Sequence, residues 1–283
     1  MSQTETLPDL QTEPTAPLAP ISSVKSSPLI LRSGRTTLAL ILREMSTRYG
    51  RSPGGYLWAL LEPLGGMLIM AIGFSLMVRS PPLGTSFLLF FATGIVPFGI
   101  FQNLSRSVGN ALNYSKALLK FPAVTWVEAL LARFLLNALT NILVMGILIT
   151  GTIIVAGLRI RPDFEPVLIA TALLCLQGVG WGALNAALGG LLPIWNTVWS
   201  IATRPLFIAS GVFFLYGDLP PAVQDILWYN PIMHVLDLFR TGFYPTYHPN
   251  HVSILYILIT GLVPLFFGVL LLGRYHRFIL SHR

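Results

Sequence analysis

The run FLLNALTNILVMGILITGTIIVAGL, residues 134–158, decides the fold, because it carries no charged residue along its whole length. About 20 apolar residues in a helix are enough to cross the roughly 30 Å of hydrocarbon in a bilayer. A second run, VLIATALLCLQGVGWGALNAALGGLL at residues 167–192, has the same character. Neither run alternates apolar and polar residues, as the strands of a membrane β-barrel do. The two runs therefore predict membrane-spanning helices and an all-α fold.

The composition of the whole chain is that of a polytopic membrane protein. Hydrophobic residues make up 54% of the 283 residues and charged residues 10%, and the mean hydropathy is +0.70, outside the usual range for soluble domains. We predict six spans, at residues 56–78, 86–104, 127–156, 167–192, 198–216 and 252–273. The single cysteine, Cys175, lies within one of these spans, so no intrachain disulfide is expected.

The positions of the basic residues predict the orientation of the chain. The formal net charge is +7, but the basic residues flank the predicted spans and do not gather on one soluble surface, so we expect no nucleic-acid partner. With both termini in the cytoplasm, 14 of the 18 basic residues lie on the cytoplasmic side, and Arg79, Arg159, Arg161 and Arg240 lie outside. This excess predicts a multi-pass protein whose two termini are cytoplasmic.

The first 52 residues predict a tail followed by a helix on the membrane surface. Residues 1–30 are rich in proline and polar residues and contain no apolar stretch of the kind found in cleavable signal peptides, so they predict a disordered tail. In residues 31–52 an apolar stripe recurs at helical spacing and a turn follows at SPGG; the stripe consists of Leu38, Ile41, Leu42 and Met45. Such a helix lies in the headgroup plane or packs on other protein. The transmembrane domain then covers residues 53–273, and a cytoplasmic tail covers residues 274–283.

Two loops carry unusual apolar segments. The cytoplasmic loop between spans two and three contains NYSKALLKFP, residues 113–122, which predicts a short basic surface helix whose apolar side contacts a partner or whose lysines contact anionic lipid. The outer segment at residues 217–251 contains two apolar stretches of about 10 residues, each broken by proline and too short to span. Its tryptophan and tyrosines favour the headgroup level. We therefore predict two short re-entrant or interfacial helices there.

Several kinds of chemistry are missing from the sequence. Only Lys25, Lys116 and Lys120 are present as lysines and none follows a glycine, so the chain has no phosphate-binding loop of the P-loop type. No G-x-S-x-G element is present. His248 and His251 share a polar loop at a spacing that we attribute to chance, and we predict no metal site. These absences predict a protein that is not an enzyme and that binds no cofactor of its own.

The charged and aromatic residues within or beside the spans are the candidate functional residues. Glu62 lies roughly 9 Å along the first span, so it either faces a wet cleft and substrate or pairs with Arg48, Arg51 or an arginine of a neighbouring helix. Glu128 and Arg133 are five residues apart, so we expect each to pair elsewhere. Aromatic side chains at the two ends of the spans fit either sugar faces or the bilayer interface; they are Tyr56, Trp58, Phe213, Phe214 and Tyr216.

The stretch RYGRSPGGYLWALLEP, residues 48–63, resembles the start of the permease subunits of ABC-2 type exporters, specifically those for capsular polysaccharide. The segment at residues 113–122 is similar to a second landmark of that family. The later SGVFF (210–214), LP (219–220), YNP (229–231) and LFRTGFYP (238–245) follow in the same order. The resemblance covers roughly residues 35–280. The chain departs from it in its long proline-rich tail and in Gly54-Gly55, where one bulkier residue is common.

The resemblance implies a homodimer of six-span subunits in the bacterial inner membrane, each docked to a separate cytoplasmic ATPase subunit that binds ATP and Mg. It also implies periplasmic adaptor and outer-membrane export proteins, and a capsular polysaccharide that carries a lipid at its reducing end. It implies re-entrant helices at residues 221–228 and 231–239 and a coupling helix at residues 110–122. The implied ATPase-coupling residues are Asn113, Tyr114, Lys116, Leu118, Lys120, Phe121 and Pro122. The implied substrate entrance and pathway residues are Arg48, Arg51, Tyr56, Trp58, Glu62, Phe213, Phe214 and Tyr216.

Other functions remain open at this point. A permease of the same superfamily could export an O-antigen, a teichoic acid or a small drug, because a fold alone does not name its cargo. A membrane scaffold or an integral glycan-processing enzyme would belong to a different class. An ATPase that co-purifies with the chain and whose turnover depends on it would favour transport, whereas a lone active enzyme would rule transport out.

Overall fold

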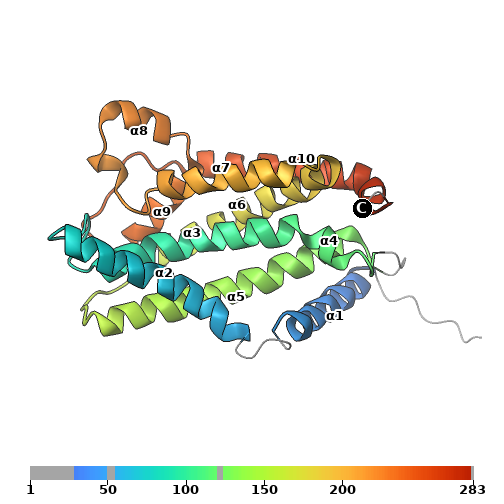
Figure 1. Ribbon diagram of the computed structural model, residues 1–283, viewed down its shortest axis with the longest axis horizontal. Coiled ribbons are helices and arrows are strands. Elements are labelled where there is room, and N and C mark those ends of the chain that lie inside the picture. Colours follow the sequence, from blue (N-terminus) through green and yellow to red (C-terminus); the bar gives the residue numbers. More distant parts are fainter. Residues whose placement is uncertain (1–28, 50–54, 120–123, 282–283) are drawn as a thin grey trace, which may run out of the picture.

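The computed structural model describes residues 29–49, 55–119 and 124–281, and every regular element in these ranges is a helix (Figure 1). The helices are α1 (Leu29–Tyr49), α2 (Gly55–Met77), α3 (Phe87–Gly109), α4 (Ala111–Ser115), α5 (Trp126–Val155), α6 (Phe164–Leu191), α7 (Trp195–Ala209), the 3-10 turn η1 (Tyr216–Asp218), α8 (Pro221–Leu227), α9 (Pro231–Thr241) and α10 (Ile254–Ser281). The all-α prediction is confirmed. The tail predicted at residues 1–30 lies almost wholly outside the described residues.

Five of the described helices are long and apolar enough to cross a membrane: α2, α3, α5, α6 and α10. The predicted fifth span, residues 198–216, differs. Its helix α7 has 15 residues and ends at Ala209, so at about 1.5 Å per residue it is shorter than the hydrocarbon thickness. Gly211 follows with a φ of 75°, a left-handed conformation that ends the helix. The polytopic fold is confirmed, and a sixth crossing stays a prediction.

The centre of the bundle is built on α6, which packs between α3 and α10 (Figure 1). Glycines let α6 and α10 approach closely, since a Cβ at Gly180 would collide with the carbonyl oxygen of Gly261 and one at Gly268 would lie 2.5 Å from the backbone nitrogen of Leu184. Small residues at helix contacts are typical of membrane proteins, where close packing supplies the association energy. The core of three helices is therefore tightly fitted.

Helices α2 and α7 lie at the margin of this core. Only 11% of an 18-residue apolar stretch of α2 is buried, compared with 67% of the corresponding stretch of α3. Large apolar side chains of α2 such as Ile69, Ile72 and Leu76 are exposed, as is Ile201 of α7. In a membrane these faces meet lipid or another protein chain. In Figure 1, α2 runs obliquely across α3 instead of following it.

Helix α1 lies against α5 at the end of the molecule that also carries α4 and the C-terminus (Figure 1). Of the predicted apolar stripe, Leu38, Leu42 and Met45 are exposed, with 57%, 59% and 38% of their surface accessible. Ile41 is half-buried, so most of the stripe faces away from the described part of the chain, where it can meet the headgroup layer or other protein, the two predicted alternatives. Of the turn predicted at SPGG, residues 52–55, only Gly55 belongs to the described residues, and it begins α2. At the other terminus the helix α10 continues to Ser281, so most of the predicted tail at residues 274–283 is helical.

Helices α8 and α9 form the opposite end of the molecule (Figure 1). Each begins with a proline in its first turn, where the missing N–H costs no hydrogen bond. The two short helices predicted in the segment 217–251 are therefore present. They differ in burial, because α8 has no buried residue whereas most of α9 is buried against α6 and α3. Their re-entry into the membrane stays a prediction.

Candidate functional site

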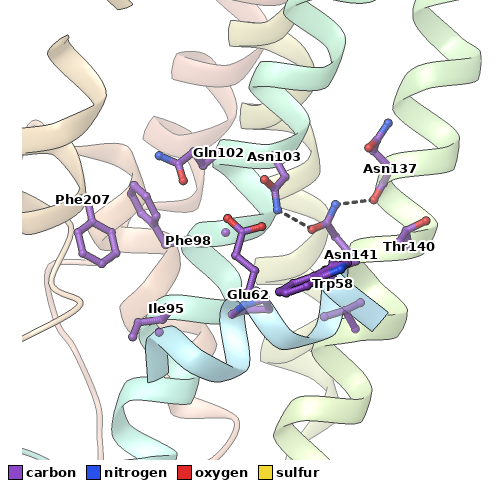
Figure 2. Close-up of a pocket in the computed structure, with 15 residues that line it drawn as sticks. Trp58, Glu62, Ile95, Phe98, Gln102, Asn103, Asn137, Thr140, Asn141 and Phe207 are labelled. Atoms are coloured by element: carbon purple, nitrogen blue, oxygen red, sulfur yellow. Dashed lines mark hydrogen bonds between the residues drawn. The ribbon is translucent and has the colours of Figure 1, made fainter. Parts of the chain in front are cut away.

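A cavity of about 460 Å³ lies between α2, α3 and α5, with one residue of α7 at its edge (Figure 2). The consecutive helices α2 and α3 thus supply two of its walls, and α5 supplies the third. Its lining joins a carboxylate, amides and a hydroxyl with aromatic rings: Trp58, Ala59, Glu62, Pro63, Gly66, Ile95, Phe98, Gly99, Gln102, Asn103, Asn137, Thr140, Asn141, Val144 and Phe207. A polar surface of this size in an apolar bundle makes this cavity the candidate functional site.

The amides of this cavity form a network between α3 and α5. The Asn103 Nδ2 donates to Asn141 Oδ1 at 3.1 Å, and the Asn141 Nδ2 donates to the backbone oxygen of Asn137 at 2.7 Å (Figure 2). One turn away, the Ser107 hydroxyl donates to Asn137 Oδ1 at 3.1 Å. Asn137 and Asn141 lie four residues apart and so share one face of α5. These bonds hold two cavity walls together and fix the direction of each amide.

Glu62 is exposed, and its side chain is directed into the cavity from α2 (Figure 2). No cation of the described residues forms an ion pair with it. The alternative of a salt bridge to Arg51 or to the side chain of Arg48 concerns parts of the chain outside the described residues, as does the side chain of Tyr56. Within the described part, Glu62 thus lines the cavity without a cationic partner.

A row of phenylalanines continues from the cavity towards α8 and α9. The rings of Phe98 and Phe207 lie 5.0 Å apart at the cavity wall, and Phe207 meets Phe213 at 5.4 Å. Of the predicted pathway aromatics, Trp58 lines the cavity and Phe213 adjoins it. Tyr216 instead stacks on His251 at 3.8 Å, and the backbone oxygen of Phe214 faces Arg240. The structure therefore brings together Trp58, Glu62 and Phe213 but not all of the predicted set.

A second cavity, of about 500 Å³, lies between α3, α6 and α7. Gln102 lines both cavities, so the two adjoin at this residue of α3. The second one is lined by Phe101, Gln102, Ser105, Arg106, Gly109, Asn110, Asn185, Asn196, Trp199, Ser200, Thr203 and Arg204. No acidic side chain of the described residues belongs to this lining, and neither arginine forms an ion pair with a described carboxylate. Two guanidinium groups among amides and hydroxyls suit an anionic, oxygen-rich ligand.

Arg133 connects three helices at the α4 end. Its Nη1 lies 3.1 Å from Glu44 Oε1 of α1, and its guanidinium lies 4.1 Å from the centre of the Tyr114 ring of α4. Glu128 instead closes the first turn of its own helix, where the backbone nitrogen of Thr125 donates to Glu128 Oε2 at 2.8 Å. The prediction that Glu128 and Arg133 have separate partners is confirmed.

Comparison with known proteins identifies the family of this bundle. Residues 35–244 match the ABC-2 type transporter family. The chain belongs to that family. It is 33% identical over 238 residues to the polysialic acid transport protein KpsM of Escherichia coli, which covers 83% of this chain and 92% of KpsM. It is 25% identical to the capsule polysaccharide export inner-membrane protein CtrC of Neisseria meningitidis over 88% of this chain and 94% of CtrC. It is also 25% identical to the corresponding protein BexB of Haemophilus influenzae over 86% of this chain and 92% of BexB.

In this ABC-2 transporter the predicted coupling segment forms α4 and the turns that follow it. Asn113 and Tyr114 are exposed, and Lys116 and Leu118 are half-buried. Lys120, Phe121 and Pro122 lie outside the described residues. The segment is thus available on the surface at the end that carries α1, and Tyr114 links it to the bundle through Arg133.

The amides are the residues that the sequence analysis missed. Asn103, Asn137 and Asn141 sit singly inside apolar runs, where a hydropathy average hides them. The spacing of four residues between Asn137 and Asn141 was the available signal, because it places both amides on one helix face. Arg106 and Arg204 were counted only among the 14 basic residues of the cytoplasmic side. Among the described residues no group of three or more metal-ligating side chains comes together.

Proposed function

We propose that this chain is the membrane subunit of an ATP-driven exporter of capsular polysaccharide, acting as a homodimer in the inner membrane with both termini in the cytoplasm. The observation that carries the proposal is the cavity between α2, α3 and α5, found in a chain whose relatives are named for capsule export. Amides and a carboxylate can exchange hydrogen bonds with sugar hydroxyls, and rings such as Trp58 offer faces to sugar rings. Hydrogen bonds within the amide network already fix the directions of these side chains, so a passing glycan meets ordered partners.

The exposed apolar faces of α2 and α7 support a dimer whose path lies between the subunits. Both helices border the cavities, and both carry large side chains that are exposed among the described residues, such as Ile72 and Ile201. Permanent homodimer interfaces are more apolar than other protein surfaces. A second copy placed against these faces turns two open cavities into one enclosed passage.

The two arginines of the second cavity support an acidic cargo. Arg106 and Arg204 would meet the carboxylates of acidic sugars or the phosphate of a lipid anchor, since guanidinium groups bind both in bidentate fashion. Arg48 and Arg51 remain our proposal for the first contact at the membrane surface. Tyr56, Phe214 and Tyr216 remain proposed pathway residues on the same footing.

The power for transport comes, in our proposal, from two separate ATPase subunits that bind ATP and Mg. The exposed Asn113 and Tyr114, with Lys116 and Leu118 beside them, support docking at α4. Lys120, Phe121 and Pro122 are assigned to the same contact. A periplasmic adaptor and an outer-membrane export protein would carry the glycan onward from the α8–α9 end.

The test combines purification with a deletion strain. We expect the chain to co-purify with an ATPase subunit whose turnover depends on it, and we expect capsular glycan to accumulate in the cytoplasm when the gene is deleted. Complementation with the Glu62→Gln and Asn103→Leu variants should restore export poorly, whereas Phe266→Ala, at an exposed position of α10 away from both cavities, should restore it fully. Accumulation of an O-antigen or a teichoic acid would reassign the cargo, and a chain active without an ATPase would overturn the proposal.

A further inference from the structure

Helix α9 buries a pair of opposite charges that the transport cavities do not use. Asp237 and Arg240 are both fully buried, with 3.2 Å between Arg240 Nη1 and Asp237 Oδ1. Removing two charges from water costs free energy that their attraction repays only with further hydrogen bonds. The pair therefore calls for a structural reason, and the contacts of Arg240 supply one.

Arg240 reaches from α9 to the turn that follows α7. Its Nη2 donates to the backbone oxygen of Val212 at 3.4 Å, and its Nη1 donates to the backbone oxygen of Phe214 at 3.5 Å. These two carbonyls flank Phe213. The guanidinium also lies 4.5 Å from the centre of the Phe90 ring of α3. One planar group can serve a carboxylate, two carbonyls and a ring in this way, whereas the point charge of a lysine cannot.

The space for this arrangement is provided by Gly94 of α3. A Cβ at this position would lie 3.1 Å from Arg240 Nη2 and 3.2 Å from the backbone oxygen of Val212. The absence of a side chain at Gly94 thus lets the guanidinium and the turn come together against α3. The turn itself starts at Gly211, whose φ of 75° redirects the chain after α7.

Phe213 is the point where α2, α3 and the end of α7 converge. Its ring lies 5.9 Å from Phe74 of α2, 6.3 Å from Phe91 of α3 and 5.4 Å from Phe207 of α7. We call these four residues the phenylalanine cluster. Phe207 also lines the first cavity, so the cluster adjoins the cavity on the side towards α8 and α9. Phe74 of α2 thus meets two rings at this level, Phe91 of α3 and Phe213.

Asp237 is itself braced from the other side. His251 Nε2 lies 3.3 Å from Asp237 Oδ2, and the His251 ring stacks on Tyr216 at 3.8 Å. The carboxylate that orients Arg240 is therefore fixed between α9 and the loop before α10. The connection runs from this loop through Asp237 and Arg240 to the turn that bears Phe213.

We infer that Arg240 is a positioning residue, which holds Phe213 in the phenylalanine cluster and so keeps the α8–α9 end of the first cavity closed in the resting protein. The inference rests on the proposed function, since a closure matters only if a glycan passes there. Arg240 touches no substrate in this role. It acts through the two carbonyls on either side of Phe213.

The test measures access to the cavity from outside. In a Cys175→Ser chain, which has no other cysteine, Ile95→Cys places a thiol in the cavity lining. A membrane-impermeant maleimide is added to spheroplasts in which the complete transporter rests without substrate. Labelling should be slow in this parent chain and roughly tenfold faster after Arg240→Gln, since losing hydrogen bonds worth about 1.4 kcal/mol shifts an equilibrium tenfold. It should also be faster after Phe213→Ala, which removes the ring that the cluster surrounds. Arg159→Gln and Phe266→Ala, at exposed positions elsewhere, should leave the rate unchanged.

Two further variants separate positioning from simple charge balance. Arg240→Lys keeps a cation for Asp237, and the double variant Asp237→Asn with Arg240→Gln removes both charges. If Arg240 served only to neutralise Asp237, both variants would label as slowly as the parent chain, and the inference would be overturned. We expect both to label fast. The lysine variant also supplies the answer if the glutamine variant fails to insert into the membrane.

The labelling experiment and the export experiment fail independently. If labelling depends on Arg240 but glycan export does not need this chain, the proposed function is wrong and the closure by Arg240 is still supported. If the chain is needed for export but the labelling rate is the same in the Arg240 and Phe213 variants as in the parent chain, only the closure is wrong.

Discussion

Replacing Arg133 by glutamine should detach α1 from the bundle, because this one side chain links α1, α4 and α5. The ion pair with Glu44 is mostly buried, with side-chain exposures of 13% and 12%. A hydrogen bond to a charged group contributes about 1.5–3 kcal/mol. The contact between the guanidinium and the Tyr114 ring, at 4.1 Å, adds about 0.5–2 kcal/mol. Together they amount to about 2–5 kcal/mol, which corresponds to a roughly 30- to 4,000-fold rise in the ratio of detached to docked α1.

The assay is a distance measurement between spin labels. In the Cys175→Ser chain, labels at the exposed Ala39 of α1 and Leu131 of α5 report docking as one short distance and detachment as a broad distribution. Glu44→Gln removes the ion pair alone, Tyr114→Leu removes the ring contact alone, and Arg35→Gln is the matched control for a lost charge on α1. The exchanged pair Glu44→Arg with Arg133→Glu should restore much of the docking. A short distance that survives Arg133→Gln, or an exchanged pair no better than the single variants, would refute the reasoning.

Three more outcomes follow from the structure. Gly180→Leu should abolish the close contact of α6 with α10 and lower the melting temperature of the purified protein by several degrees, whereas Gly151→Leu, where an added Cβ meets nothing within 4 Å, should change it little. Asn141→Leu should weaken the α3–α5 contact by about 0.6 kcal/mol, as measured by thermal unfolding, and should lower glycan export further than Ile142→Leu on the exposed side of α5. Burial lowers the pKa of His234, as does nearby His251, while the Trp228 carbonyl and Asp237 oppose the shift. The folded state therefore binds a proton at His234 less readily than the unfolded state does. The contribution of His234 to the free energy of unfolding is complete above the ordinary pKa of about 6.5 and is lost as the pH falls below it. The pH dependence of unfolding should therefore become flatter between about pH 7 and 5 in His234→Gln.

The long apolar runs allowed the helices of the bundle to be predicted closely. The run at residues 127–156 corresponds to α5 (Trp126–Val155), and that at 167–192 to α6 (Phe164–Leu191), because length without charge is what a membrane crossing requires. The run at 198–216 was less informative. Its apolar residues continue beyond Ala209, but hydropathy reports an apolar environment and not a backbone conformation, so it could not reveal the turn at Gly211.

The candidate site was only partly predictable, for a different reason. Glu62 and Trp58 stood out because charged and aromatic residues are rare or patterned in a span. Asn103 and Asn141 belong to the site because they contact each other across two helices. They are 38 residues apart in the sequence, so no local pattern could indicate this contact. Arg240 was counted as an outer charge, whereas it is buried with Asp237, because burial depends on how α9 docks onto α3 and α6.

The unequal packing of the walls determines which of them can move. In a bilayer, apolar side chains exchange protein neighbours for lipid at little cost, since lipid tails are as apolar as leucine. Only 11% of the apolar stretch of α2 is buried. This helix contacts the bundle through apolar side chains, among them the ring of Phe74 against Phe91 and Phe213. Helices α3 and α5, in contrast, are joined by amide and hydroxyl hydrogen bonds that lipid cannot replace. We therefore expect the cavity to widen by movement of α2 over the α3–α5 wall, and we expect the phenylalanine cluster, which Arg240 positions in our inference, to resist this movement.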